Sequence, residues 1–131
     1  MSGIQLVVVT PEATVLDEPC QFVAVPMIDG EAGILPGHAP MIGRLQPGEL
    51  RVRGDGKEQS FYVDGGFVQV NSNVVSVLTN TSKPVGQLDV AAAEEALSTA
   101  KAMSSETPEL ADMKDRAVAQ ARAQIRLASK A

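Results

Sequence analysis

The run GEAGILPGHAPMIGRLQPGEL, residues 30–50, is the most informative part of this 131-residue chain. Three prolines and five glycines interrupt short apolar pairs within it. Proline and glycine at this density are typical of tight turns, and they exclude a helix or a long strand. We therefore expect a rigid stretch that presents a defined shape.

Two interpretations of residues 30–50 are consistent with the residues alone. The first is a surface connection in an all-β domain that buries a few apolar side chains in the core, namely Ile34, Leu35, Met41 and Ile42. The second is a preformed docking surface, because prolines and tight turns reduce the ordering entropy that binding costs. His38 is the only histidine, and a lone histidine is more often packed or hydrogen-bonded than catalytic.

Short apolar runs, separated by Gly, Pro, Asn or Asp, fill the rest of the chain up to residue 84. They predict strands at residues 4–9, 13–16, 20–25, 49–53, 59–63, 67–70 and 74–78, the second of which ends at Asp17-Glu18-Pro19. The Gly54-Asp55-Gly56 turn predicts a β-hairpin. Parallel strands would need helical crossovers, so residues 1–84 are predicted to form an antiparallel β-sandwich or barrel of about eight to ten strands.

Composition excludes several classes of function. A net charge of −5 and a pI near 4.8 argue against a nucleic-acid partner, which needs a basic surface. Cys20 is the only cysteine, so the chain alone cannot form an intrachain disulfide or a Cys/His zinc site, and Cys20 is expected to be a small buried side chain. No signal peptide and no 18-residue apolar run is found, so a reducing cytoplasm and no membrane insertion are expected.

After residue 84 the composition changes to strong helix formers. Asp89 is a suitable N-cap for a first helix that ends near residues 103–105, and Thr107 and Pro108 suit the start of a second helix. Apolar residues recur every three or four positions in both helices: Val90, Ala93, Leu97 and Ala100, then Leu110, Ala117, Ala121, Ile125 and Ala128. The sequence predicts two domains, residues 1–84 and an antiparallel helical hairpin over residues 85–131.

Two features of this hairpin leave alternatives open. Its apolar stripes are mostly alanine, and because a methyl group buries little area, the hairpin is either a permanent cap on the sandwich or a unit that separates and extends. Four basic residues follow residue 115 without an acid, and the last three lie four residues apart: Arg116, Arg122, Arg126 and Lys130. They form either an ordinary solvated face or a docking site for an acidic partner or a polyphosphate.

Several runs of residues together resemble one family. They are GEAGILPGHAP at residues 30–40, LQPGEL at 45–50, GGFVQV at 65–70 and NVVSVL at 73–78. With the helical tail, they make essentially the whole chain similar to the epsilon subunits of bacterial F-type ATP synthases, the counterparts of the mitochondrial delta subunit. The ILPGHAP run is the most specific part of this resemblance.

The resemblance implies a flattened antiparallel β-sandwich followed by the helical hairpin, in a non-catalytic subunit of the central rotor stalk. Such subunits bind the gamma subunit and sit on the loops of the membrane ring of proton-carrying subunits, peripherally at the cytoplasmic face of the bacterial inner membrane. By this pattern the ring would contact the turn Ile28-Asp29-Gly30-Glu31. The gamma subunit would contact the run His38-Ala39-Pro40-Met41-Ile42.

The resemblance also suggests roles for the hairpin. In relatives it rises along gamma and blocks ATP hydrolysis through contacts with the catalytic alpha and beta subunits, for which Arg116, Arg122 and Arg126 are the candidates here. Some relatives bind ATP through the motif I/L-D-x-x-R-A, which here reads Leu88-Asp89-Val90-Ala91-Ala92-Ala93. Asp89, Arg122 and Arg126 would be the nucleotide contacts, but Ala92 replaces the arginine. We therefore expect weak or absent ATP binding and no cofactor, with Asp89 acting as an N-cap.

Two functions of other classes remain as alternatives. A stand-alone nucleotide-sensing regulatory module would show ATP affinity in the absence of gamma. A small β-sandwich enzyme is disfavoured, because the sequence has no P-loop, no nucleophile elbow and no catalytic spacing of His, Cys or Asp. A polar pocket with a carboxylate paired to His38 would revive the enzyme hypothesis.

Overall fold

The computed structural model describes residues 3–130, without the side chain of residue 130. The chain divides into two compact units, Met1–Pro84 and Val85–Ala131. The division lies where the composition changes from β-branched residues and turn formers to strong helix formers.

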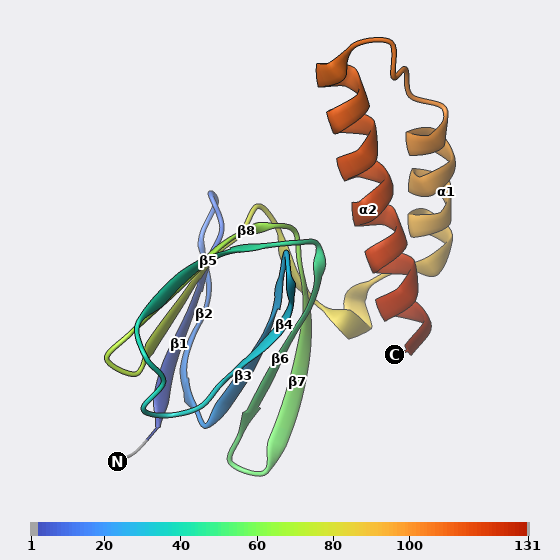
Figure 1. The fold of residues 1–131 in the computed structure, drawn as a ribbon. Helices are drawn as coiled ribbons and strands as arrows, with labels where there is room; N and C mark the ends of the chain where they lie inside the picture. The colour runs from blue at the N-terminus through green and yellow to red at the C-terminus, as the bar shows by residue number, and fades with distance from the viewer. Residues whose placement is uncertain (1–2, 131) are drawn as a thin grey trace. The chain divides into compact units, whose positions relative to one another are not determined.

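Ten strands build the described part of the first unit. They are β1 (Ile4–Val9), β2 (Thr14–Cys20), β3 (Phe22–Met27), β4 (Gly30–Ile34), β5 (Met41–Leu45), β6 (Gly48–Gly54), β7 (Lys57–Val63), β8 (Gly66–Asn71), β9 (Val74–Leu78) and β10 (Ser82–Pro84). Their hydrogen-bonded order is β10-β7-β6-β3-β5-β8-β9-β1-β2, with β4 paired to β3. Figure 1 shows them as two layers that face each other. The predicted β-sandwich is confirmed.

The two layers are joined by one short pairing. Strands β10, β7, β6, β3 and β4 form one layer, and β5, β8, β9, β1 and β2 form the other. They meet where Met27 of β3 pairs with Leu45 of β5. All strand pairs are antiparallel except β1 with β9, which run parallel from Gln5↔Val74 to Val9↔Leu78. No helical crossover is needed for this pair, because the seven strands between them along the chain make the connection.

The core lies between the layers and follows the two-residue period of the strands. Its fully buried members are aliphatic, and Val23, Val25, Leu50 and Val63 of one layer face Leu6, Val68, Val70, Val75 and Val77 of the other. Burying this area supplies the main stabilisation of the unit. Cys20 belongs to the same core, with 4% of its surface exposed, as expected.

Two expectations about the strands are wrong. The predicted turn at Asp17-Glu18-Pro19 lies inside β2, because its backbone pairs with β1 and the chain turns at Gln21 instead. Residues 30–50 contain the short strands β4 and β5 and the start of β6, and the second wrong expectation concerns which of their side chains are buried. Of its four expected core residues, Ile34 is buried and Met41 packs against the core, whereas 59% of Leu35 and 74% of Ile42 is exposed.

The second unit is a helical hairpin, as predicted. It comprises η1 (Val85–Gln87), α1 (Val90–Lys101) and α2 (Pro108–Lys130), and α1 and α2 pack side by side in opposite directions (Figure 1). The Thr107 hydroxyl accepts a hydrogen bond from the Leu110 N–H at 3.1 Å, which begins α2 where it was expected. Among the described residues of this unit, the buried ones are Val85, Ala93, Ala100, Ala121, Ala123 and Leu127. Ala123 and Leu127 are not among the apolar positions that the sequence predicted for α2.

Candidate functional site

A backbone hydrogen bond closes a tight turn in the loop between β4 and β5. The His38 N–H donates to the Leu35 carbonyl at 3.1 Å, closing a turn with Pro36 and Gly37 at its centre. Gly37 has φ 84°, which a proline–glycine turn of this type requires and glycine adopts without steric cost. The Nδ1 of His38 lies 2.7 Å from the Ala39 carbonyl, which can only accept, so Nδ1 carries the proton and donates. The His38 ring thus contacts a neighbouring carbonyl and not the carboxylate that the enzyme hypothesis needs.

The residues expected to contact gamma leave this loop and enter β5. Ala39 and Pro40 are exposed, and Met41 and Ile42 point to opposite sides because side chains alternate along a strand. Met41 faces the core and Ile42 faces outward. The structure therefore leaves Ile42, rather than Met41, as the apolar side chain available to a partner.

Ile42 belongs to a larger apolar face that the sequence analysis missed. It lies on the outer side of β5, β8 and β9, where 53% of Phe67, 40% of Val74 and 51% of Leu78 is exposed. Phe67 pairs with Leu78 and with Arg44, which places these side chains on the same outer side. We call Ile42, Phe67, Val74 and Leu78 the apolar face. The sequence feature that could have indicated this face is the nearly continuous apolar run of residues 74–78. A strand with one side in solvent normally alternates apolar and polar residues, so an apolar residue on both sides suggests that the outer side is also covered.

Two shallow hollows indent this face. One, of about 350 Å³, is lined by Pro40, Met41, Ile42, Gln69, Val70 and Asn71. The other, of about 330 Å³, is lined by Val9, Thr10, Pro11, Gly66, Phe67, Leu78, Thr79 and Asn80. Polar side chains lie between the four apolar ones on the same outer side, and exposed apolar side chains beside such hollows make this face a candidate protein-docking surface.

The turn expected to contact the membrane ring lies at the other end of β4. It joins β3 to β4, and the Ile28 N–H donates to the Arg44 carbonyl at 3.1 Å. Ile28 is 57% exposed, Asp29 and Gly30 are exposed, and Gly30 has φ 126°. Because β4 runs from this turn to the loop before β5, the two expected contact regions lie at opposite ends of one strand (Figure 1).

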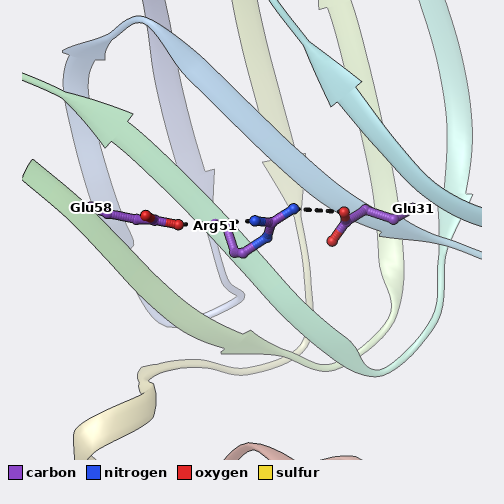
Figure 2. A network of polar contacts seen from close by, with 3 residues as sticks. All are labelled: Glu31, Arg51 and Glu58. Atoms are coloured by element: carbon purple, nitrogen blue, oxygen red, sulfur yellow. Dashed lines mark hydrogen bonds and ion pairs between the residues drawn. The ribbon is translucent and has the colours of Figure 1, made fainter. Parts of the chain in front are cut away.

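Glu31, the last residue of this turn, is engaged within the sandwich. Its Oε1 accepts from Nη2 of Arg51 at 2.7 Å, and Nη1 of Arg51 lies 3.9 Å from Oε1 of Glu58 (Figure 2). The hydrogen bond that Arg51 donates to Glu31, together with nearby carboxylates, raises the pKa of Arg51. A basic side chain of a partner would have to compete with Arg51 for Glu31, whereas the Asp29 carboxylate forms no ion pair with any described residue.

The three arginines expected to act as inhibitory contacts are exposed on α2. Arg122 and Arg126 lie four residues apart, one above the other on one face. Arg116 is six residues before Arg122, which at 100° per residue places it about 120° away around the helix. The structure therefore brings Arg122 and Arg126 together and separates Arg116 from them. Within residues 3–130, none of these three arginines forms an ion pair.

Asp89 caps α1. Its Oδ1 accepts from the backbone N–H groups of Ala91 at 2.9 Å and Ala92 at 3.3 Å. Its φ of −114° and ψ of 115° are the extended conformation of an N-cap. The sequence motif thus has a structural explanation here, and Ala92 presents only a methyl group where the motif has an arginine.

Residues 3–130 also provide no metal site, no reactive thiol and no membrane-spanning helix. No group of three or more His, Cys, Asp or Glu is placed to hold a metal ion in this range. The buried Cys20 thiol has a raised pKa, because burial and the neighbouring Glu18 carboxylate both disfavour the thiolate. No helix in the described part of the chain is long and apolar enough to span a membrane.

Comparison with known proteins identifies the family. A model of the beta-sandwich domain of the ATP synthase delta/epsilon chain matches residues 3–85. The chain belongs to the ATP synthase delta/epsilon family. The resemblance inferred from the GEAGILPGHAP run is thereby confirmed.

Relatives extend this family membership over both units. The ATP synthase epsilon chain of Rhodopirellula baltica is 51% identical over 124 residues, covering 95% of this chain and 97% of the relative. That of Herpetosiphon aurantiacus is 36% identical over 124 residues, covering 95% and 91%. The match therefore includes the helical hairpin.

Solved structures of mitochondrial ATP synthases contain chains with the same fold. A chain of the Euglena gracilis mitochondrial ATP synthase, in a structure of OSCP, F1 and c-ring, superposes with a TM-score of 0.84 at 26% identity, covering 100% of this chain and 83% of that one. A chain of the Tetrahymena thermophila central stalk and c-ring has a TM-score of 0.77 at 13% identity, covering 95% and 96%, and shows the fold alone.

Proposed function

We propose that this chain is a non-catalytic subunit of the central stalk of an F-type ATP synthase, which couples the gamma subunit to the membrane ring. The observation that carries the proposal is the 51% identity to an ATP synthase epsilon chain over 95% of this chain. The Euglena relative, found in an assembly with F1 and c-ring, supports it. A subunit in this position would be a peripheral membrane protein at the cytoplasmic face of a bacterial plasma membrane.

The gamma subunit binds on the apolar face in this proposal. Ile42 is at once part of the expected gamma contact and the most exposed member of the apolar face, at 74%. Covering large aliphatic and aromatic side chains contributes about 1.5–3 kcal/mol for each one fully buried, more than an exposed ion pair does. Shape and apolar contact, with His38, Ala39 and Pro40 at one edge, would therefore supply most of the affinity.

The ring contact belongs to the turn at the other end of β4. Ile28 and Asp29 are the exposed side chains there, one apolar and one acidic. Glu31 contributes less directly, because Arg51 already holds its carboxylate at 2.7 Å. Contact regions at opposite ends of one strand suit a subunit that links the gamma subunit to the membrane ring.

The hairpin carries the regulatory part of the proposal. Arg122 and Arg126 offer two guanidinium groups on one face of α2, which suits a carboxylate-rich segment of the catalytic alpha and beta subunits. Arg116 would need a separate acceptor, because it lies on another side of the helix. The predicted outcome is inhibition of ATP hydrolysis that depends on the Arg122 and Arg126 pair.

Two matched substitutions test the assignment of the two contacts. Ile28→Glu and Phe67→Glu each place a charge at a side chain of similar exposure, 57% and 53%. Each full-length variant is titrated against the catalytic head that carries gamma, and then against the complete membrane-bound enzyme. Phe67→Glu should weaken binding to the gamma-bearing head at least tenfold. Ile28→Glu should bind that head normally and lose coupling only in the membrane-bound enzyme.

The same titration can contradict the proposal in two ways. If the wild-type chain does not bind the gamma-bearing head, the central-stalk function is wrong. If Phe67→Glu binds as tightly as the wild type while remaining folded, the gamma contact does not lie on the apolar face.

The hairpin is also proposed to bind ATP weakly or not at all. Asp89 is used as the N-cap of α1, and Ala92 brings no charge to a phosphate. Isothermal titration of the full chain with ATP should give no measurable heat at micromolar concentrations. Micromolar affinity in the absence of gamma would contradict this and favour the nucleotide-sensing alternative.

A further inference from the structure

We propose that Asn73 is a positioning residue, which fixes the loop at residues 35–40 and thereby holds the shape of the surface that gamma meets. The second part of this inference rests on the proposed function, whereas the first part concerns the chain alone. Asn73 lies in the turn between β8 and β9, far from the loop in sequence. Neither its side chain nor this turn belongs to the residues expected to bind a partner.

Asn73 bonds the loop through its side chain. Its Oδ1 accepts a hydrogen bond from the Gly37 N–H at 2.7 Å, across 36 residues of sequence. Gly37 is at the centre of the Pro36-Gly37 turn, and its N–H is one of the few donors that this proline-rich loop possesses. The bond therefore joins the tip of the loop to a turn of the neighbouring strands.

The backbone of Asn73 is itself held in place. Asn71 pairs with Val74, so Ser72 and Asn73 form a two-residue hairpin turn, with φ of 52° and 64°. Asparagine is one of the few residues other than glycine that adopt this conformation readily. The Asn73 carbonyl also accepts from the Gln5 N–H of β1 at 2.8 Å. A rigid support of this kind lets a side-chain acceptor set the position of a loop.

The bond joins the two chain segments that continue from the walls of the first hollow, and neither Gly37 nor Asn73 lines the hollow itself. One wall of that hollow, Pro40, Met41 and Ile42, continues from the loop, and the other wall, Gln69, Val70 and Asn71, leads into the turn that holds Asn73. The β5–β8 ladder begins only at Met41↔Val70. Asn73 therefore extends the link between the two walls beyond the ladder, to the part of the loop that bears His38.

Three substitutions separate the acceptor from the backbone conformation. Asn73→Gly keeps the positive φ and removes the acceptor, Asn73→Asp keeps an acceptor oxygen, and Asn73→Ala loses both. Ser72→Gly is the matched control, because Ser72 has a similar φ in the same turn and its hydroxyl bonds only Asn71. The measurements on the full chain are amide hydrogen exchange at Gly37 and His38, the unfolding temperature, and the Kd for the catalytic head carrying gamma.

We expect Asn73→Gly to speed exchange of the Gly37 amide and to raise the Kd about three- to tenfold, the range that the net contribution of one hydrogen bond converts to. Asn73→Asp should restore both values, and Ser72→Gly should leave both unchanged. A merely structural role would lower the unfolding temperature in all turn variants without selective exchange at Gly37 or rescue by Asp.

The inference is overturned if Asn73→Gly leaves exchange at Gly37 at the wild-type rate. It is overturned in its second part if exchange rises and the Kd stays unchanged. Failure of the wild-type chain to bind the head would instead refute the proposed function, and the exchange measurement would still decide whether Asn73 positions the loop.

Discussion

Gly66 offers the most stringent test of the sandwich geometry. It begins β8 with φ 102°, and a Cβ built on it would lie 1.8 Å from the Leu78 carbonyl oxygen and 2.9 Å from Thr79 Cα. These atoms belong to the backbone of β9 and the residue after it, so no side chain can rotate away. Gly66→Ala therefore forces apart the strands that carry the apolar face.

The cost of this substitution has two parts. A non-glycine residue at such a φ costs about 1–3 kcal/mol, and displacing a packed backbone costs about as much again. Together they amount to about 2–6 kcal/mol, a large share of the 5–15 kcal/mol typical of a domain. For a unit of this size each kcal/mol lowers the unfolding midpoint by about 4–8 °C, so we expect a fall of at least about 8 °C.

Tyrosine fluorescence is a suitable assay, because Tyr62 is the only tyrosine in a chain without tryptophan and lies in β7 of the sandwich. Gly30→Ala is the control, since Gly30 has φ 126° but no atom within 4 Å of its built Cβ. It should show only the conformational cost of about 1–3 kcal/mol. Equal destabilisation by the two variants would refute the close approach of Gly66 to Leu78.

Three further predictions concern single groups. Burial and Glu18 raise the pKa of the Cys20 thiol above 9.0, so Cys20 should react with a thiol reagent only after unfolding, and rapid reaction of the folded chain would contradict this. The contribution of the protonated thiol to the free energy of unfolding should be present below pH 9 and should fall as the pH rises further. Asp89→Ala should destabilise the helical unit by about 0.5–2 kcal/mol, as followed by circular dichroism, and Asp89→Ser should recover most of the loss. Glu31→Gln should change the free energy of unfolding in urea by less than about 1 kcal/mol, because its pair with Arg51 is half exposed, and a larger loss would show that the pair is structural.

Local sequence patterns determined most of the secondary structure. The run at residues 4–9 alternates apolar side chains toward the core and matches β1. Asp89 and Thr107 mark the starts of α1 and α2, because a helix cap is formed by residues within one turn of each other. The GEAGILPGHAP run was sufficient to indicate the family, because an arrangement of glycines and prolines this specific is written in adjacent residues.

The candidate surface was only partly accessible to sequence reasoning. Residues 38–42 were indicated as a docking region, but the sequence did not tell which of Met41 and Ile42 faces outward. The sequence pattern places Phe67 and Leu78 in predicted strands and does not distinguish them from their neighbours as exposed residues. Which side of a strand faces the core depends on pairing register, and a shift of one residue would reverse every side chain.

The sequence by itself thus determined the strand-rich first unit, the helical second unit, the helix caps and the family. Only the tertiary structure decided that β2 continues through Pro19, that β1 and β9 pair in parallel, and that Ile42, Phe67, Val74 and Leu78 share one exposed face. It also placed Asn73 against Gly37. The physical reason is that turns and caps are stabilised by neighbours along the chain, whereas strand pairing, facing and loop support depend on contacts between residues far apart in sequence.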